Sequence, residues 1–396
     1  MDTSATGTSP GLADSLSRLG TETAFSVLAR ARELERHGRE IVHLEIGEPD
    51  FDTPAHIKDA AAAALRAGET HYCPTAGIAV LREEAARYLS RTRDIDVDPG
   101  RVLVANGAKP FLFFTVLATC NPGDEVVYPD PGFPIYESAI RWVGATPVPL
   151  PLEEERDFAF DLADLESRLG PRTKLVILNS PQNPTGGALS AEEMERAAAL
   201  LADSGAWVLS DEVYSRMVYD GEFASVASYP GMLERTIVLD GFSKTYAMTG
   251  WRCGYAAVPE PLVDPLVRFF VNSTSCVPPF VQLAGVAALT GPQDEPEAMV
   301  AEFLARRELV VSGLNELPGV TCRVPRGAFY AFPNVSGVPL ETEELADRLL
   351  QEAGVAVLAG SAFGRHGTDN LRISYANSRE NLALAIERMG GFLESL

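Results

Sequence analysis

The sequence is poor in basic residues, and this shortage excludes two classes of partner. Lysine and arginine number 33 against 55 acidic residues, which gives a formal net charge of −22 and a pI near 4.7. Nucleic acids and anionic membrane surfaces bind proteins through basic surfaces. We therefore expect neither as a partner and expect a small-molecule substrate instead.

Cysteine and histidine are also scarce, which excludes two kinds of site. The five cysteines form no CxxC pair and are spread along the chain at Cys73, Cys120, Cys253, Cys276 and Cys322. Their odd number and wide spacing argue against a disulfide framework and against a zinc site. The five histidines form no HxxxH or HExxH arrangement, so we expect no catalytic metal.

Long apolar runs are missing as well. No stretch reaches the roughly 18 apolar residues that a membrane helix needs, and the first residues lack the basic start and apolar core of a secretory signal. We expect a cytoplasmic protein in which residues 1–20 form a flexible N-terminus. A chain of 396 residues exceeds the usual size of one compact domain, so we expect two domains.

Short apolar runs alternate with turns and helical stretches over most of the chain. We predict central strands at 102–105, 125–128, 174–178, 206–209, 236–239 and 254–258. Ser190 and Glu193 have the spacing of a capping box that begins a helix, and Gly205 is expected to end that helix. Continuous apolar strands between helices are typical of a mostly parallel α/β sheet covered on both faces. Such sheets bind ligands beyond the carboxyl ends of their strands.

The elements become shorter towards the C-terminus, which indicates a second, smaller α+β domain. We predict a large domain over 51–305, a small C-terminal domain over 306–396 with strands at 327–332 and 370–374, and a segment at 21–50 that joins the small domain. Thr53 is expected to cap the helix that follows this segment, with Pro54 as its first residue.

Polar residues follow four of the predicted strands. These turns are Gly107-Ala108-Lys109-Pro110, 179–186, Asp211-Glu212-Val213-Tyr214 and Gly241-Phe242-Ser243-Lys244. Each alone is an ordinary α/β turn, but together they resemble the class I and II aminotransferases, a family of fold-type I pyridoxal-phosphate (PLP) enzymes. The densest match is Ser-Lys-Thr-Tyr-Ala-Met-Thr-Gly-Trp-Arg-Cys-Gly-Tyr at 243–255, with further blocks at 47–51 and 183–186. The pattern resembles the bacterial aspartate-aminotransferase-like subgroup.

The resemblance implies PLP as the cofactor and a role for each residue around its ring. Lys244 would carry PLP as a Schiff base, where otherwise a lysine would be a surface charge. Asp211, after an apolar run, would pair with the protonated pyridine nitrogen, although a helix N-cap is an alternative. Tyr214 and Asn183 would hydrogen-bond the phenolic oxygen, and Phe133 would stack on the ring unless it belongs to the core.

The resemblance also implies a phosphate site that is shared across a homodimer. The turn formed by Gly107, Ala108 and Lys109 lies before a helix whose first N–H groups would bind phosphate. Ser243 would add a hydroxyl and Arg252 a guanidinium fork, although Arg252 could instead form a surface ion pair. Tyr72 is implied to reach across the interface to the neighbouring phosphate. The two active sites would then depend on each other.

Substrate binding is implied for Arg372, Gly47 and Asn183. Arg372 would bind the α-carboxylate bidentately, whereas the alternative is a strand arginine that faces solvent. We find no clear second arginine for a side-chain carboxylate; Lys109, Thr21 and Thr23 are candidates for that role. Aspartate, alanine and neutral amino acids therefore all stay open as donors.

The implied reaction is ping-pong transfer of an amino group from an L-amino acid to a 2-oxo acid. Motifs that hold a cofactor do not decide which bond breaks, so a PLP-dependent lyase, cyclase or oxidase is the alternative. A regulator with an aminotransferase-like domain is disfavoured because about 20 residues precede the matching region. An NAD enzyme is disfavoured because no GxGxxG follows a strand.

Overall fold

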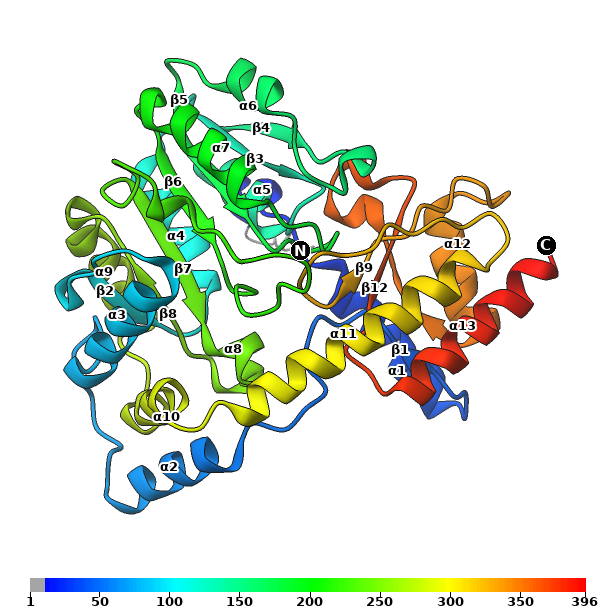
Figure 1. The fold of residues 1–396 in the computed structure, drawn as a ribbon, viewed down its shortest axis with the longest axis horizontal. Coiled ribbons are helices and arrows are strands. Elements are labelled where there is room, and N and C mark those ends of the chain that lie inside the picture. The colour runs from blue at the N-terminus through cyan, green and yellow to red at the C-terminus, as the bar shows by residue number, and fades with distance from the viewer. Residues whose placement is uncertain (1–10) are drawn as a thin grey trace, which may run out of the picture.

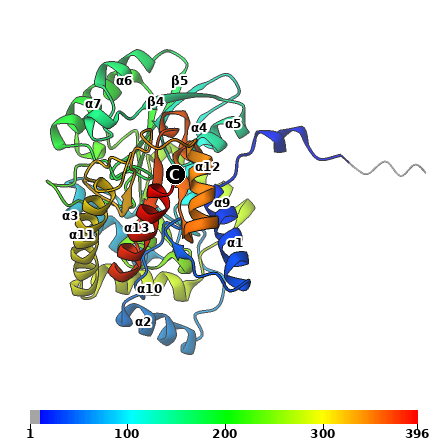
Figure 2. The ribbon, with the colours of Figure 1, turned by 90° about the vertical axis from the view of Figure 1, so that its right-hand side faces the viewer.

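The computed structural model describes residues 11–396, and Figure 1 shows a large part built on a central sheet beside a smaller part. Residues 1–10 of the predicted flexible N-terminus lie outside the described residues. A short 3₁₀ helix, η1 (Asp14–Arg18), follows them and buries none of its residues. In Figure 2 this segment projects from the side of the molecule. It is attached where the Gly20 N–H donates to Ser138 Oγ at 2.9 Å.

The central sheet has seven strands in the order β2-β8-β7-β6-β5-β3-β4. Their bounds in that order are Val102–Ala105, Gly254–Ala257, Thr236–Gly241, Trp207–Asp211, Thr173–Asn179, Glu125–Asp130 and Thr146–Pro151. Only β8 runs antiparallel to its neighbours, while the other pairs are parallel. The prediction of a mostly parallel sheet is therefore confirmed. Asn179 is in register with Asp211, so the carboxyl ends of β5 and β6 meet at one edge.

Helices cover both faces of this sheet. The helices of this large part are α2 (Ala55–Arg66), α3 (Ala79–Arg93), α4 (Lys109–Thr119), α5 (Ile135–Val143), α6 (Leu162–Arg168), α7 (Ala191–Ser204), α8 (Phe242–Thr245), α9 (Glu260–Ser273) and α10 (Pro279–Thr290). Along β5, Leu175 and Ile177 belong to the core with α4, α5 and α9, whereas Val176 and Leu178 belong to the core with α6 and α7. Both sides of the strand are buried, which explains its unbroken apolar sequence.

Two predictions of helix ends had different outcomes. Ser190 and Glu193 form the capping box that begins α7, and Gly205 ends that helix in a left-handed conformation. The N-cap assigned to Thr53 is wrong. Pro54 occupies that position without a side-chain cap, because the Thr53 hydroxyl donates instead to Ala247 O at 2.7 Å.

The smaller part combines both ends of the described chain. Its helices are α1 (Thr23–Arg36), α12 (Thr342–Arg348) and α13 (Arg379–Glu394), and its strands are β1 (Val42–His43), β9 (Tyr330–Ala331), β10 (Val355–Ala356), β11 (Leu358–Ala359) and β12 (Leu371–Ser374). β1 pairs with β10, and β11-β12-β9 form an antiparallel sheet. β9 is shorter than the predicted strand at 327–332. In residues 11–396 no helix is both long and apolar enough to span a membrane.

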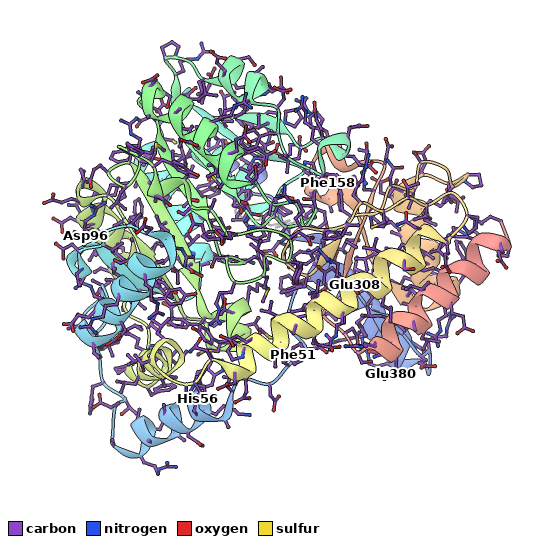
Figure 3. The ribbon with its side chains drawn as sticks, viewed as in Figure 1. Phe51, His56, Asp96, Phe158, Glu308 and Glu380 are labelled. Carbon is purple, nitrogen blue, oxygen red and sulfur yellow. The ribbon has the colours of Figure 1, made fainter. Side chains whose placement is uncertain are left out.

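The long helix α11 (Asp294–Asn315) connects the two parts and runs between them in Figure 1. The boundary predicted at residue 305 falls inside this unbroken helix. Phe51, from the Gly-Glu-Pro-Asp-Phe block, packs on Phe303 of α11 with ring centroids 5.5 Å apart (Figure 3). Asp50 pairs with Arg306 of the same helix at 2.6 Å. These contacts attach the segment that carries Gly47 to α11.

Candidate active site

A cavity of about 490 Å³ opens at the carboxyl edge of the central sheet. The predicted site residues that line it are Gly47, Ala108, Lys109, Phe133, Asn183, Asp211, Tyr214, Ser243, Lys244, Arg252 and Arg372. They come from segments spread over more than 300 positions of the sequence. The fold therefore brings nearly all of the predicted residues to one place.

Lys244 lies on α8, directly after β7, and its Nζ donates to the carbonyl oxygen of Gly47. The amine is also 5.7 Å from the ring centroid of Phe329. Burial and then the nearby Arg372 cation lower the pKa of Lys244 to about 8, while Glu48 opposes them. The lowered pKa increases the share of this amine that is neutral near pH 7, and a neutral amine can act as a nucleophile or a base.

Asp211 ends β6 and is buried. Its Oδ2 accepts a hydrogen bond from Tyr136 Oη at 2.7 Å, whereas its buried Oδ1 has no hydrogen-bond partner within the described chain. Burial raises the pKa of Asp211 to about 6, against the lowering effect of Tyr136. No helix begins at Asp211, so the N-cap alternative is wrong. Asp211 lines the cavity, so its unpaired Oδ1 could accept a hydrogen bond from a protonated ring nitrogen.

Tyr214 and Asn183 contact groups that the sequence did not indicate. Tyr214 Oη lies 2.8 Å from Tyr330 Oη, and both side chains are buried. Asn183 Oδ1 accepts from Arg372 Nη1 at 3.3 Å. A Cβ at Gly47 would lie 2.1 Å from Tyr330 Oη. Glycine at position 47 therefore allows this tyrosine to reach the cavity.

The start of α4 and Arg252 form a cradle that fits a phosphate group. Gly107 has a φ of +90°, and a Cβ there would lie 2.4 Å from Arg252 Nη2. The absence of that Cβ lets the guanidinium lie against the turn that begins α4. Helix N–H groups, a guanidinium and the Ser243 hydroxyl are suitable donors for a dianion. Ala108 and Ser243 line the cavity beside this cradle.

Arg372 lies on β12 and is only 4% exposed. The alternative of a solvent-facing strand arginine is therefore wrong. Its Nη2 donates to Glu45 O, and its guanidinium carbon lies 4.9 Å from the ring centroids of Tyr330 and Phe363. Its Nε is buried and has no partner among residues 11–396, and burial lowers its pKa. A buried cation with a free donor fits a carboxylate ligand.

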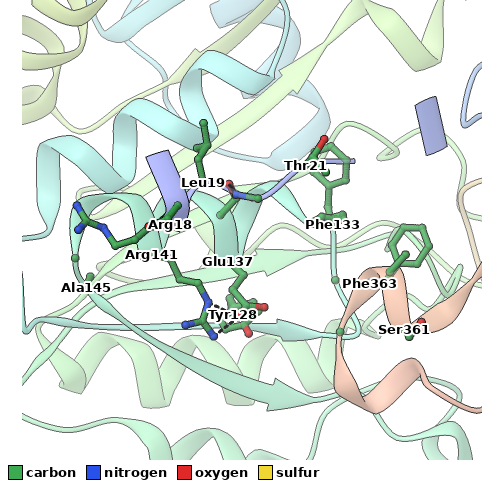
Figure 4. Close-up of a pocket in the computed structure, with 18 residues that line it drawn as sticks. Arg18, Leu19, Thr21, Tyr128, Phe133, Glu137, Arg141, Ala145, Ser361 and Phe363 are labelled. Carbon is green, nitrogen blue, oxygen red and sulfur yellow. Dashed lines mark hydrogen bonds and ion pairs between the residues drawn. The ribbon is translucent and has the colours of Figure 1, made fainter. Parts of the chain in front are cut away.

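Three predicted residues, Tyr72, Thr21 and Thr23, do not line the cavity. The Tyr72 side chain is 91% exposed on the connection between α2 and α3. Thr21 lines a second, open cavity of about 660 Å³, with Phe133 and the ion-paired Glu137 and Arg141 on its wall (Figure 4). Phe133 lines both cavities, whereas Thr21 lines only this second one.

Sequence reasoning missed a buried ionic network directly behind the cavity. Arg93 donates to Glu212 Oε2 at 3.0 Å and also pairs with Asp240. Glu212 follows Asp211, and Asp240 precedes the turn that leads to Lys244. All three side chains of the network are at most 2% exposed. The acidic residues were visible in the sequence, but their cation lies 119 residues before Glu212.

Comparison with known proteins gives one family. The family model for aminotransferase class I and II matches residues 39–389. The aspartate/prephenate aminotransferase of Cereibacter sphaeroides is 40% identical over 97% of this chain and 99% of its own length. Aromatic-amino-acid aminotransferase 2 of Thermococcus litoralis is 41% identical over 88% of this chain and 90% of its own length.

Solved structures agree with the sequence comparison. Aspartate aminotransferase from Rhizobium meliloti superposes with a TM-score of 0.92 at 37% identity, covering 98% of this chain and 99% of that one. The site described above has the open acceptor, the lysine and the phosphate cradle that a PLP enzyme of this family needs. The chain belongs to the class I and II aminotransferases, whose cofactor is pyridoxal 5'-phosphate.

Proposed function

We propose that Lys244 is the catalytic base of this aminotransferase and that Arg372 orients the amino donor against it. One observation carries this proposal: Lys244, with its pKa lowered to about 8, shares a cavity with the free Nε of Arg372 and the free Oδ1 of Asp211. A base, a carboxylate site and a partner for the ring nitrogen thus face one space. Transamination needs this combination.

The side chains around the cavity divide into those that hold the cofactor ring and those that hold its phosphate. Asp211 would accept from the ring nitrogen, Tyr214 and Asn183 would hydrogen-bond the phenolic oxygen, and Phe133 would cover one face of the ring. The backbone N–H groups of Gly107, Ala108 and Lys109 would hold the phosphate, together with the side chains of Ser243 and Arg252. When bound, PLP supplies an electron sink for the charge that develops at the substrate Cα.

Arg372 would bind the donor's α-carboxylate together with Gly47 and Asn183, which fixes the position of Cα. Neutral Lys244 would then accept the proton from the donor's Cα at its Nζ and hold it there for the return step. The Arg372 cation helps this step because it lowers the pKa of Lys244. Release of a 2-oxo acid and entry of a second 2-oxo acid would complete a ping-pong cycle.

A half-reaction distinguishes this function from a lyase, cyclase or oxidase on the same scaffold. PLP-loaded enzyme is mixed with single L-amino acids, and the conversion of the cofactor to its pyridoxamine form is followed by absorbance. We expect that conversion together with one equivalent of 2-oxo acid. Release of ammonia without the pyridoxamine form would contradict the proposal.

We also propose a cytoplasmic homodimer with two-domain subunits. The exposed Tyr72 supports shared active sites, because an aromatic side chain 91% exposed on a loop is well placed to enter a neighbouring subunit. The five free cysteines suit a reducing compartment. Pairing of β1 with β10 supports assignment of 21–50 to the small domain with 306–396, beside a large domain at 51–305. Sedimentation equilibrium of the holoenzyme tests the dimer. We expect the mass of two subunits, and the mass of one subunit would contradict the proposal.

A further inference from the structure

Residues at the start of α1 form part of the wall of the active-site cavity. Glu22, the N-cap residue of this helix, lines the cavity together with Ala24 and Phe25. Its carboxylate accepts a hydrogen bond from Lys109 Nζ. The Glu22 side chain is 18% exposed and that of Lys109 is 43% exposed. A carboxylate of the protein itself thus occupies the side of Lys109 that faces the helix.

This ion pair changes which substrates the cavity can accept. Of the cations that line the cavity, Lys244, Arg252 and Arg372 have roles in the proposed function. Lys109 is the remaining cation that could bind a carboxylate in a donor side chain, but Glu22 already neutralises it. A dicarboxylic donor would have to displace Glu22 and leave a partly buried carboxylate without its partner, which is unfavourable.

The charge of Glu22 also acts on the rest of the cavity. It lies close enough to Arg372 to favour the charged form of that guanidinium, and close enough to Tyr330 to disfavour ionisation of the phenol. A second carboxylate on the donor would meet this negative charge at short range. Repulsion between two like charges lowers the affinity for a wrong ligand more than the loss of one favourable contact does.

The remaining wall suits an apolar side chain. Phe25, Ile46, Leu112 and Phe133 line the cavity around the ion pair, and Lys109 Nζ lies 5.9 and 5.5 Å from the ring centroids of Phe25 and Phe133. Transfer of an apolar side chain from water to such a surface is favourable. A cationic donor gains little here, because Lys109 already neutralises Glu22.

We propose that Glu22 is a specificity-determining residue that directs this enzyme to L-amino acids with neutral apolar or aromatic side chains and away from dicarboxylic ones. The inference rests on the proposed function, since it assigns the donor class of the same cavity. Glu22 replaces Thr21 and Thr23 as the residue near the start of α1 that matters for the donor side chain, because neither threonine lines this cavity.

The test compares L-aspartate with L-phenylalanine as donors for the wild type and for Glu22→Gln. We expect the wild type to favour phenylalanine, and Glu22→Gln to raise the aspartate-to-phenylalanine ratio of kcat/KM by about tenfold, the typical effect of one charged contact on selectivity. This gain should disappear in the double variant Glu22→Gln/Lys109→Met. The matched control is Glu125→Gln at the start of β3. The Glu125 side chain is also 18% exposed, and it forms an ion pair with Arg172. The control should keep the wild-type ratio.

A binding measurement separates failure of this inference from failure of the proposed function. Calorimetry on the PLP-loaded enzyme compares succinate with 3-phenylpropanoate, which carry the two side-chain types without an amino group. We expect the wild type to bind 3-phenylpropanoate more tightly than succinate. In Glu22→Gln, the ratio of the two dissociation constants should shift towards succinate by about tenfold, as for the ratio of kcat/KM. A wild type that prefers aspartate and succinate, a preference for lysine or arginine, or an unchanged ratio in Glu22→Gln would overturn the inference. Absence of the pyridoxamine form with every donor, alongside the expected binding, would overturn only the proposed function.

Discussion

Replacement of Tyr136 by phenylalanine should raise the pKa of Asp211 without disturbing the fold around it. The tyrosine ring is buried, and its hydroxyl donates to Asp211 Oδ2 at 2.7 Å. This hydrogen bond favours the ionised carboxylate, so its loss favours the protonated form. A hydrogen bond to a charged group contributes about 1.5–3 kcal/mol, and about 1.4 kcal/mol corresponds to one pKa unit. The pKa of Asp211, about 6 in the wild type, should therefore rise by about 1–2 units.

The measurement uses the cofactor-free protein, in which no ring nitrogen competes for the carboxylate. Difference infrared spectroscopy follows the carboxyl band of Asp211 between pH 4 and 9 in the wild type and in Tyr136→Phe. Asp211→Asn identifies the band, because that variant must lack it. A midpoint that stays near the wild-type value, or that falls, would refute the idea that Tyr136 keeps Asp211 ionised.

Three further variants test the lysine, the arginine beside it and the buried network. Lys244→Ala should abolish transamination and also the borohydride-stable attachment of PLP, checked by mass spectrometry; an attached cofactor would contradict the assignment. Arg372→Met removes a cation that lowers the pKa of Lys244, which is about 8 in the wild type. The pH midpoint for acylation of Lys244 in the cofactor-free enzyme should therefore rise, and an unchanged or lower midpoint would argue against this effect. Arg93→Met leaves two buried carboxylates without their cation and should cost about 3–5 kcal/mol in urea unfolding. The control Arg172→Met, at an exposed ion pair, should cost at most about 1 kcal/mol, and equal losses would contradict the role of the network.

Local patterns in the sequence were sufficient for many of the elements. The run 174–178 is apolar at every position after its first, and β5 is buried on both faces as that pattern predicts. Ser190, Glu193 and Gly205 marked the ends of α7 correctly. Capping and strand burial depend on neighbouring residues, so a single sequence contains the information. The wrong N-cap at Thr53 shows the limit of such signals, since a distant carbonyl competed for the hydroxyl.

The sequence by itself determined the family, the cofactor class and the turns that carry Lys244 and Asp211, because those residues lie in short motifs with fixed spacing. Only the tertiary structure decided what surrounds them. Tyr136 reaches Asp211 across 75 positions, and Lys109 meets Glu22 across 87. Pairs so far apart leave no periodicity or spacing in a single chain. The chemistry of transamination is therefore readable in the sequence, whereas the pKa values and the charge of the donor pocket follow from which distant side chains the fold places together.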